Sequence, residues 1–403
     1  MSPAGERRIV LGNARVVTPF RTIPRGGVVV EGARIAEVFS GEPGQRREGD
    51  RRIDLGGRTL APGFIEIHTH GAGGHDFMDG TLEAVLGACR THLRHGVTSI
   101  YPTKLTCTDQ ELTRNLELIR AAMDVQEGMP EILGVHLEGP YFSPEQKGAQ
   151  DPRYLRNPDC QEYLGILERF DFIRRWTVAP ELPGGLAMGR DLRERGIVAS
   201  IGHSNAVYEE VLAAFENGYT LVTHLFNGMS RLVRKNAFMY PGVAESALAI
   251  DGLAVEVIAD GRHLPASLLK LIYKVKGSGA ICLTSDSMRA AGLDVKESII
   301  GSLANGQRVV IEDGVAFMPD RTSFGGGIAT ADRLIRTMVQ QVEVPLPEAV
   351  RMLTHTPARV MGVDGRKGSL AAGKDADLVA FDGDIRIALV MVGGQIHLDT
   401  LSK

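Results

Sequence analysis

Eight short apolar runs alternate with stretches of helical periodicity, and this alternation limits the possible fold more than any other feature of the chain. One helical stretch places Val207, Val211, Ala214 and Phe215 on a single apolar stripe. Strands that alternate with helices form parallel βαβ units, and eight such units predict an α/β fold, a (β/α)8 barrel of the TIM type. The runs are 60–68, 97–103, 132–138, 176–181, 197–203, 221–227, 254–260 and 280–286.

The two ends of the chain have a different pattern, because short β-branched segments follow one another there without helical stretches between them. These segments are 9–17, 27–31 and 34–39 near the start, and 378–381, 387–392 and 395–398 near the end. We expect both ends to join in a small β-sandwich domain of residues 1–59 and 367–403, beside a barrel of residues 60–366.

One segment inside the barrel region departs from the alternation. Residues 299–319 have turn signals at Gly306 and at Asp313 and Gly314, which predict an inserted hairpin. Two further helical stretches, 329–341 and 347–360, are expected to close the barrel.

Composition excludes several classes of partner. The 403 residues include 45 Lys and Arg against 49 Asp and Glu, a net charge of −4, so no basic footprint for nucleic acid is expected. A run of about 18 apolar residues, the length that spans a membrane, is absent from the sequence. The four cysteines stand far apart with no C-x-x-C pair, which favours a reduced, cytoplasmic setting.

Side chains of the types that bind metals follow the carboxyl ends of five of the apolar runs. In a (β/α)8 barrel these ends meet on one face, where reactive groups gather. His68 and His70 are two residues apart on a strand and therefore share a side of it. Without a cation, such a buried cluster would leave unpaired polar groups that cost several kcal/mol, so we predict a divalent metal site. The cluster is His68, His70, Glu138, His203, His224 and Asp286.

Several ordered motifs carry a resemblance to a known family. They are LAPGFIEIHTHG from Leu60, HLEGP from His136, GHSN from Gly202, THLFNGM from Thr223, ADGRH from Ala259, SDS from Ser285 and GKDADLV from Gly373. The first and last resemble the metal-dependent amidohydrolase superfamily, and the others resemble its N-acetylglucosamine-6-phosphate deacetylase family. The resemblance runs along almost the whole chain and implies hydrolysis of the N-acetyl group of an amino sugar phosphate, in amino sugar catabolism.

The resemblance also implies roles for the clustered residues. Glu138, His203 and His224 match the family's principal metal site, and His68 and His70 match members that hold a second ion. We therefore expect Glu138 to bridge two divalent ions, zinc first, although iron, manganese or cobalt also suit such ligands. Asp286 matches the general base, which takes a proton from water and passes it to the departing amine. His136 lies two residues before Glu138 and shares its inward side; we expect it to have an orienting role through a hydrogen bond, and simple packing is the alternative.

Substrate contacts follow from the same motifs. His263 matches a histidine that contacts the substrate, and Asn227 and Gly228 match residues near the sugar phosphate.

The chain departs from the family pattern in two loops. Gln150 stands where the family usually has a histidine that polarises the substrate carbonyl, a duty that a second ion is expected to take over. The segment 231–242 replaces the family's usual GREPG. There Arg231 and Arg234 are expected to bind the phosphate; a solvated basic loop is the alternative.

Other functions fit parts of the same pattern. The altered loop leaves open N-acetylgalactosamine-6-phosphate or an unphosphorylated N-acetylamino sugar as the substrate. A non-catalytic metal-binding or sugar-binding homologue would not need Asp286. A cyclic-amide hydrolase of the dihydroorotase type is disfavoured, because the fourth apolar run ends at Glu181 without the lysine that such enzymes commonly use. Family members usually form a homodimer or a larger assembly such as a homotetramer, so we expect an oligomer.

Overall fold

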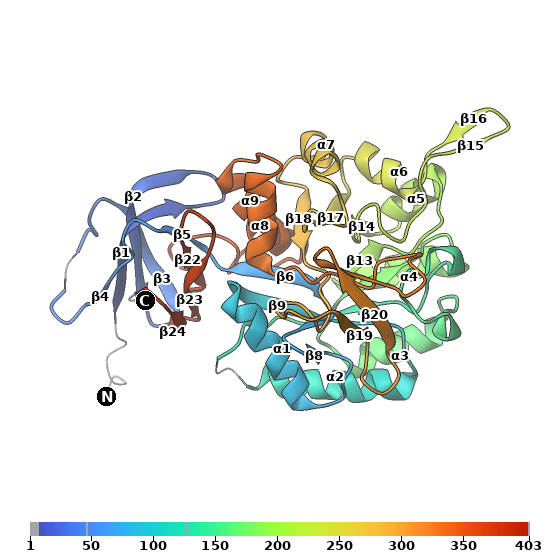
Figure 1. Cartoon of the computed structure of the whole chain (residues 1–403), viewed down its shortest axis with the longest axis horizontal. Coiled ribbons are helices and arrows are strands. Elements are labelled where there is room, and N and C mark those ends of the chain that lie inside the picture. The colour runs from blue at the N-terminus through green and yellow to red at the C-terminus, as the bar shows by residue number, and fades with distance from the viewer. Residues whose placement is uncertain (1–7, 46, 126–127, 402–403) are drawn as a thin grey trace.

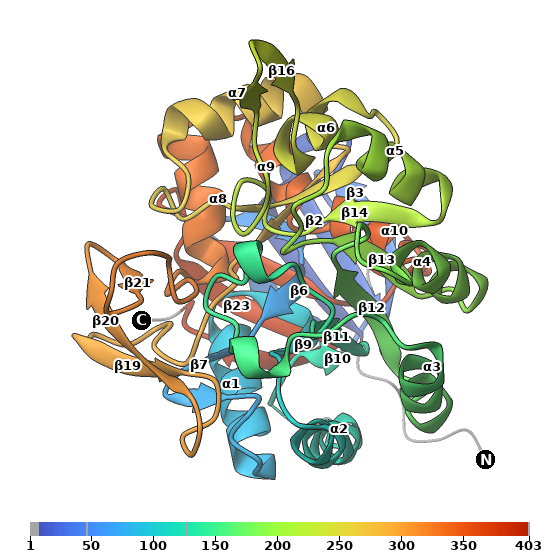
Figure 2. The same cartoon turned by 90° about the vertical axis from the view of Figure 1, so that its right-hand side faces the viewer.

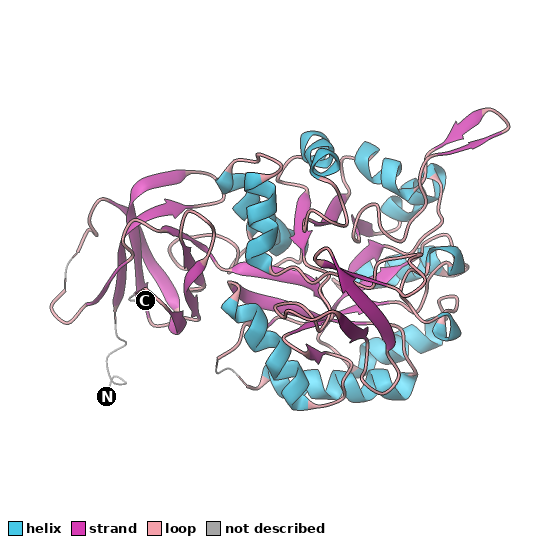
Figure 3. Cartoon of the chain, viewed as in Figure 1, coloured by secondary structure: helices cyan, strands magenta, loops and turns pink. Residues whose placement is uncertain are grey.

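The computed structural model describes residues 8–45, 47–125 and 128–401, and a barrel of parallel strands forms its centre (Figures 1 and 2). The strands follow one another around the barrel in chain order, and helices cover the outside (Figure 3). The predicted (β/α)8 fold is thereby confirmed. The barrel strands are β6 (Phe64–Thr69), β9 (Val97–Lys104), β11 (Val135–Glu138) with the short β10 (Glu131–Ile132) before it, β12 (Ile173–Val178), β13 (Val198–Ile201), β14 (Tyr219–Val222), β17 (Ala254–Ile258) and β18 (Ile281–Thr284).

The first and last barrel strands meet beside the predicted site. The amide of Asp286 donates to the carbonyl of His68 at 3.1 Å, and the amide of His70 donates to the carbonyl of Ser287 at 2.7 Å. The hydroxyl of Thr284 also donates to the His68 carbonyl, at 2.8 Å. Barrel closure therefore fixes the backbone of Asp286 next to the strand that carries His68 and His70.

The helices agree with the predicted ones except near the end of the barrel. The stretch 347–360 forms two short helices instead of one, because Pro357 has no amide hydrogen and its ring would clash with the carbonyl four residues earlier in a continuous helix. The helices are α1 (Leu82–Arg94), α2 (Asp109–Met123), α3 (Cys160–Arg169), α4 (Gly185–Glu194), α5 (Tyr208–Glu216), α6 (Val243–Ala249), α7 (Ala266–Lys276), α8 (Ala331–Gln340), α9 (Leu346–Met352) and α10 (His355–Val360), with 3-10 turns η1 (Pro144–Gln146) and η2 (Pro152–Tyr154).

Both ends of the chain contribute strands to a second sheet, which lies beside the barrel (Figure 1). β5 lies between β1 and β22, so one strand joins the two ends. The apolar run 60–68 comprises the end of β5 and then β6, so this strand crosses the predicted boundary at residue 60. The sheet order is β24 (Gln395–Asp399), β23 (Ile387–Val392), β22 (Leu378–Phe381), β5 (Thr59–Pro62), β1 (Ile9–Val17), β2 (Thr22–Glu31) and β3 (Arg34–Ser40), with β4 (Arg51–Asp54) paired to β1.

Three small antiparallel elements are inserted in the barrel loops. The segment predicted as a hairpin is a three-stranded sheet of β19 (Glu297–Ile300), β20 (Gln307–Glu312) and β21 (Val315–Phe317), because its two turn signals make two turns rather than one. A hairpin of β15 (Val233–Lys235) and β16 (Phe238–Tyr240) projects away from the barrel (Figure 1). β7 (Gly71–Ala72) and β8 (His75–Asp76) form a third pair directly after β6.

Candidate metal and active site

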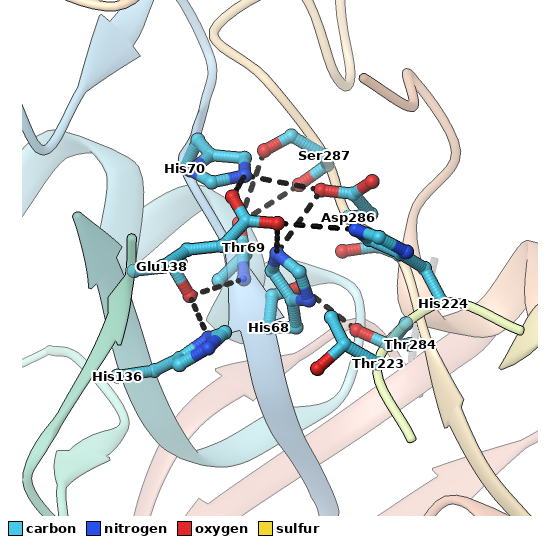
Figure 4. A network of polar contacts seen from close by, with 12 residues as sticks. His68, Thr69, His70, His136, Glu138, Thr223, His224, Thr284, Asp286 and Ser287 are labelled. Carbon is cyan, nitrogen blue, oxygen red and sulfur yellow. Dashed lines mark hydrogen bonds and ion pairs between the residues drawn. The ribbon is translucent and has the colours of Figure 1, made fainter. Parts of the chain in front are cut away.

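The six side chains singled out at the strand ends meet at one end of the barrel. All of them except His203 are labelled in Figure 4. Five of them are at most 6% exposed, so the cluster lies at the floor of the barrel mouth rather than on its surface. His203, His224 and Asp286, which directly follow barrel strands, have positive φ angles of 48°, 30° and 43°. Residues other than glycine rarely adopt this left-handed conformation, and it concentrates at functional sites, where surrounding structure holds the strain.

Glu138 is the centre of the cluster. Its Oε1 lies 3.0 Å from His203 Nε2 and 3.1 Å from His224 Nε2. The same oxygen is 3.6 Å from His68 Nε2, and Oε2 is 3.4 Å from His70 Nε2. One carboxylate therefore faces two pairs of imidazoles, which is the arrangement that a bridging ligand needs.

Asp286 faces the pair on the first strand. Its Oδ1 lies 3.1 Å from His70 Nε2 and 3.3 Å from His68 Nε2. Burial raises the pKa of this carboxyl, but His68 and His70 outweigh burial and hold the pKa below its ordinary value. Asp286 is therefore ionised at neutral pH and able to accept a proton.

The contacts within the cluster suit a divalent cation. His203 Nε2 and His224 Nε2 are 3.1 Å apart and both face Glu138 Oε1, so three potential ligand atoms converge on one point. His68 Nε2 is buried and has no hydrogen-bond partner in the described structure. Imidazole nitrogens with carboxylate oxygens are the ligands that zinc and other first-row metals prefer. Two sets of ligand atoms lie within 4.8 Å of one another, and they share Glu138: His68, His70 and Glu138, and Glu138, His203 and His224.

A third cluster, made of carboxylates alone, also has the spacing of a metal site, but its side chains pair with basic residues. Glu131, Asp375 and Asp377 surround the ammonium of Lys367, which lies 2.5 Å from Glu131 and 2.5 Å from Asp377. Lys367 and Arg366 already pair with these carboxylates, so this group is an ion-pair network.

Gln150 and His136 both lie beside the cluster. The side-chain amide of Gln150 donates to Glu138 Oε2 at 2.9 Å, while its Oε1 accepts from the amide and hydroxyl of Thr106. Gln150 thus orients the shared carboxylate. The ring nitrogens of His136 contact the hydroxyls of Thr103 and Thr177 at 3.2 and 2.7 Å, and its ring packs edge-on against His68. His136 therefore supports the cluster by packing against His68, and the hydrogen bonds recorded for its ring go to threonines.

A cavity opens above the cluster and contains the predicted sugar-binding residues. His263 lines it, and Asp260 contacts Nδ1 of this ring at 2.8 Å, which leaves Nε2 for a ligand. Asn227 and Gly228 also line the cavity, and a Cβ at Gly228 would approach His203 Nδ1 to 3.0 Å. Glycine at position 228 therefore lets the loop lie close to a candidate metal ligand.

The arginines predicted for the phosphate are in different places. Arg231 lines the cavity, and its guanidinium donates to the carbonyl of Phe226 at 2.6 Å. Arg234 lies on the projecting hairpin, outside the set of described residues that line the cavity. Arg321 also lines the cavity, although no motif in the sequence points to it; it follows the inserted sheet. It pairs with Glu312 at 2.6 Å and stacks on Phe317.

Comparison with known proteins agrees with this geometry. The model of the Amidohydrolase family matches residues 59–397. The N-acetylglucosamine-6-phosphate deacetylase of Haemophilus influenzae is 32% identical over 96% of this chain and 99% of its own length. The enzyme of the same name from Homo sapiens is 31% identical over 98% of this chain and 96% of its own. This chain belongs to the N-acetylglucosamine-6-phosphate deacetylase family of amidohydrolases.

Solved structures of the family have the same fold. The N-acetylglucosamine-6-phosphate deacetylase of Pasteurella multocida superimposes with a TM-score of 0.89 at 31% identity, over 96% of this chain and 99% of that one. A mutant of the Mycobacterium smegmatis enzyme, in complex with N-acetyl-D-glucosamine-6-phosphate, gives 0.88 at 29% identity, over 98% and 100%. Membership implies use of a divalent metal, which the His and Glu clusters fit. Within the described residues, every helix is too short or too polar to cross a membrane.

Proposed function

We propose that the chain hydrolyses N-acetylglucosamine-6-phosphate to glucosamine-6-phosphate and acetate. The observation that carries this proposal is the position of Asp286. This ionised carboxylate lies 3.1 Å from His70, at the floor of a cavity that candidate metal ligands line. The names of the full-length relatives supply the substrate. A homologue that only binds a sugar has no use for such a proton acceptor.

We infer two ions per chain, with Glu138 shared between the pair His68 and His70 and the pair His203 and His224. Zinc is the first candidate, and iron, manganese and cobalt suit the same ligands. Divalent ions held there would make the substrate carbonyl more electrophilic and a nearby water more acidic. The chelating pairs come from three separate strands, so the barrel itself sets the spacing between the two positions.

Proton transfer is the part that this chain's own residues perform. Asp286 accepts a proton from the attacking water and then gives it to the nitrogen of the breaking C–N bond, so the amine leaves neutral. The backbone contact between Asp286 and His68 holds this carboxylate in place. Gln150 keeps Glu138 oriented through its 2.9 Å hydrogen bond.

Sugar and phosphate are held higher in the cavity. We assign His263, oriented by Asp260, together with Asn227 and Gly228, to the sugar. Arg231 and Arg321 line the same cavity and supply positive charge for the phosphate. Arg321 therefore compensates for the missing family arginine motif.

The proposal is tested by acetate release from purified, zinc-loaded protein. N-acetylglucosamine-6-phosphate should be the best substrate, ahead of N-acetylgalactosamine-6-phosphate and of unphosphorylated N-acetylglucosamine. Equal rates with phosphorylated and unphosphorylated sugars would refute recognition of the 6-phosphate. No acetate from any of the three would refute the deacetylase activity.

We also infer that the chain works as a homodimer or homotetramer. The projecting hairpin exposes Phe238 by 70% and Met239 by 49%, and a lone two-stranded hairpin is marginally stable in water. A mass of one chain by light scattering at micromolar concentration would contradict this inference.

A further inference from the structure

Two oppositely charged side chains lie inside the barrel below the ligand cluster, and the proposed mechanism does not use them. Glu256 lies on β17 and Arg175 on β12, and both are 0% exposed. Burial of an ionised carboxylate and a guanidinium is unfavourable unless each is well paired. The contacts of Glu256 and Arg175 therefore indicate which role offsets the cost of burying the two charges.

Glu256 connects the arginine to the metal cluster. One of its oxygens lies 2.6 Å from His68 Nδ1, and the other pairs with the guanidinium of Arg175. A carboxylate paired with a guanidinium accepts hydrogen bonds, so the proton of the neutral ring sits on Nδ1. The other nitrogen, Nε2, then presents its lone pair to the cluster, 3.3 Å from Asp286 and 3.6 Å from Glu138.

Arg175 is itself held by three other segments of the barrel wall. It donates to the hydroxyl of Ser200 at 2.9 Å, to the carbonyl of Ile67 at 3.2 Å and to the hydroxyl of Thr223 at 2.9 Å. The planar guanidinium has little freedom once these bonds form. Arg175 therefore holds one oxygen of the Glu256 carboxylate in place, and the other oxygen holds the ring of His68.

The other candidate ligands have different partners. His203 Nδ1 contacts the backbone carbonyl of Gln146 at 2.8 Å. Nδ1 of His70 and Nδ1 of His224 have no hydrogen-bond partner in the described structure. A charged partner on Nδ1 thus distinguishes His68 from these three histidines.

We propose that Glu256, held by Arg175, is a positioning residue that aims His68 Nε2 into the metal cluster and strengthens binding of the ion that His68 and His70 hold. The inference rests on the proposed two-ion site. Outer carboxylates of this kind change metal affinity by about 10–100-fold in other proteins.

The test compares Glu256→Gln with a matched variant, Glu131→Gln. Both changes replace a carboxylate that pairs with an arginine, since Glu131 pairs with Arg366, but Glu131 contacts no residue of the cluster. Metal-free protein is titrated with zinc by calorimetry, and melting temperatures are measured with and without zinc. The wild-type chain is expected to bind two zinc ions.

Glu256→Gln should bind one of the two ions about 10–100-fold more weakly and the other with wild-type affinity. Its melting temperature should therefore rise less on zinc addition than that of the wild type. Glu131→Gln should lower the melting temperature equally with and without zinc, and keep both affinities. If Glu256→Gln behaves in the same way as Glu131→Gln, the pair is merely structural and the inference fails.

A second variant covers the case in which Glu256→Gln does not fold. Glu256→Asp keeps the charge opposite Arg175 but withdraws the oxygen from His68, so the same single ion should bind more weakly. Unchanged zinc affinity in Glu256→Asp would overturn the inference. Wild-type protein that releases no acetate, together with weakened zinc binding in these variants, would refute the proposed function while supporting the positioning role.

Discussion

The floor of the cavity lies on barrel strands, whereas its mouth lies on loops and on the inserted sheet. Floor residues such as His68 and Glu256 are 0% exposed and contact side chains of other barrel strands. At the mouth, Arg321 has a side chain that is 54% exposed and pairs with Glu312 on the insertion. The chemistry that every amide substrate needs is therefore built into the rigid part, and recognition of one particular substrate is left to the adaptable part. Substitutions at the floor should change catalysis or metal binding, and those at the mouth should change substrate preference.

The largest effect is expected at the floor. Asp286→Asn removes the proton acceptor and should lower kcat by about 10²–10⁴-fold. The melting temperature and the zinc content, measured by elemental analysis, should stay close to those of the wild type. Acetate release within a few-fold of the wild-type rate would show that another group is the base.

Metal removal tests the floor as a whole. Dialysis against a chelator should abolish acetate release, and zinc at 100 times its dissociation constant should restore it while stabilising the fold by about 2.7 kcal/mol for each ion bound. Activity and melting temperature are followed in the same titration. Full activity in protein shown to be free of metal would contradict the two-ion proposal.

Gln150 lies at the border between floor and mouth. Gln150→Leu leaves the backbone amide of Thr106 without its acceptor and frees Glu138 to rotate, so kcat should fall by about tenfold. KM for the substrate should change less than kcat, since the side chain acts on Glu138. A rise in KM alone would instead indicate that Gln150 contacts the sugar.

At the mouth, the two cavity arginines should affect phosphate alone. Arg321→Ala and Arg231→Ala should each raise KM for N-acetylglucosamine-6-phosphate by about tenfold, the loss of one partly exposed charge-assisted hydrogen bond. Rates with unphosphorylated N-acetylglucosamine serve as the control and should not change. A similar loss of activity with both sugars would indicate that these side chains support the fold and do not recognise the phosphate.

The smallest effect is expected on the projecting hairpin. Arg234→Ala should leave kcat and KM within about twofold of the wild type, as for most exposed side chains that bind nothing. A KM increase comparable to that of Arg321→Ala would show that Arg234 binds the phosphate after all. Kinetics of the two variants, measured side by side, decide between these outcomes.

The same contrast explains what could be predicted from the sequence. His203 and His224 were found because each was placed at the carboxyl end of a predicted strand, and parallel strands bring such positions together. Glu256 also carried a signal that was missed, since it is a charged residue in the middle of the apolar run 254–260. Arg175 carried a weaker signal, because it stands beside Arg174 and just before the run 176–181.

The mouth carried no comparable signal. Arg321 lies near the cavity because of the way the inserted sheet packs over the barrel, and no local periodicity encodes this packing. Arg234 was expected beside the phosphate because it lies, with Arg231, in the loop that replaces the family's arginine motif. The chain turns outward into β15 there, and Arg234 lies outside the described residues that line the cavity.

The strand β5 has a consequence for how the chain is made. Its residues Thr59–Pro62 pair with β1 on one side and with β22, Leu378–Phe381, on the other. A nascent chain therefore carries an unpaired strand edge next to the first barrel strand until residue 381 has left the ribosome. Such edges invite aggregation, so translation that stops before this point should yield products that need chaperones or are degraded.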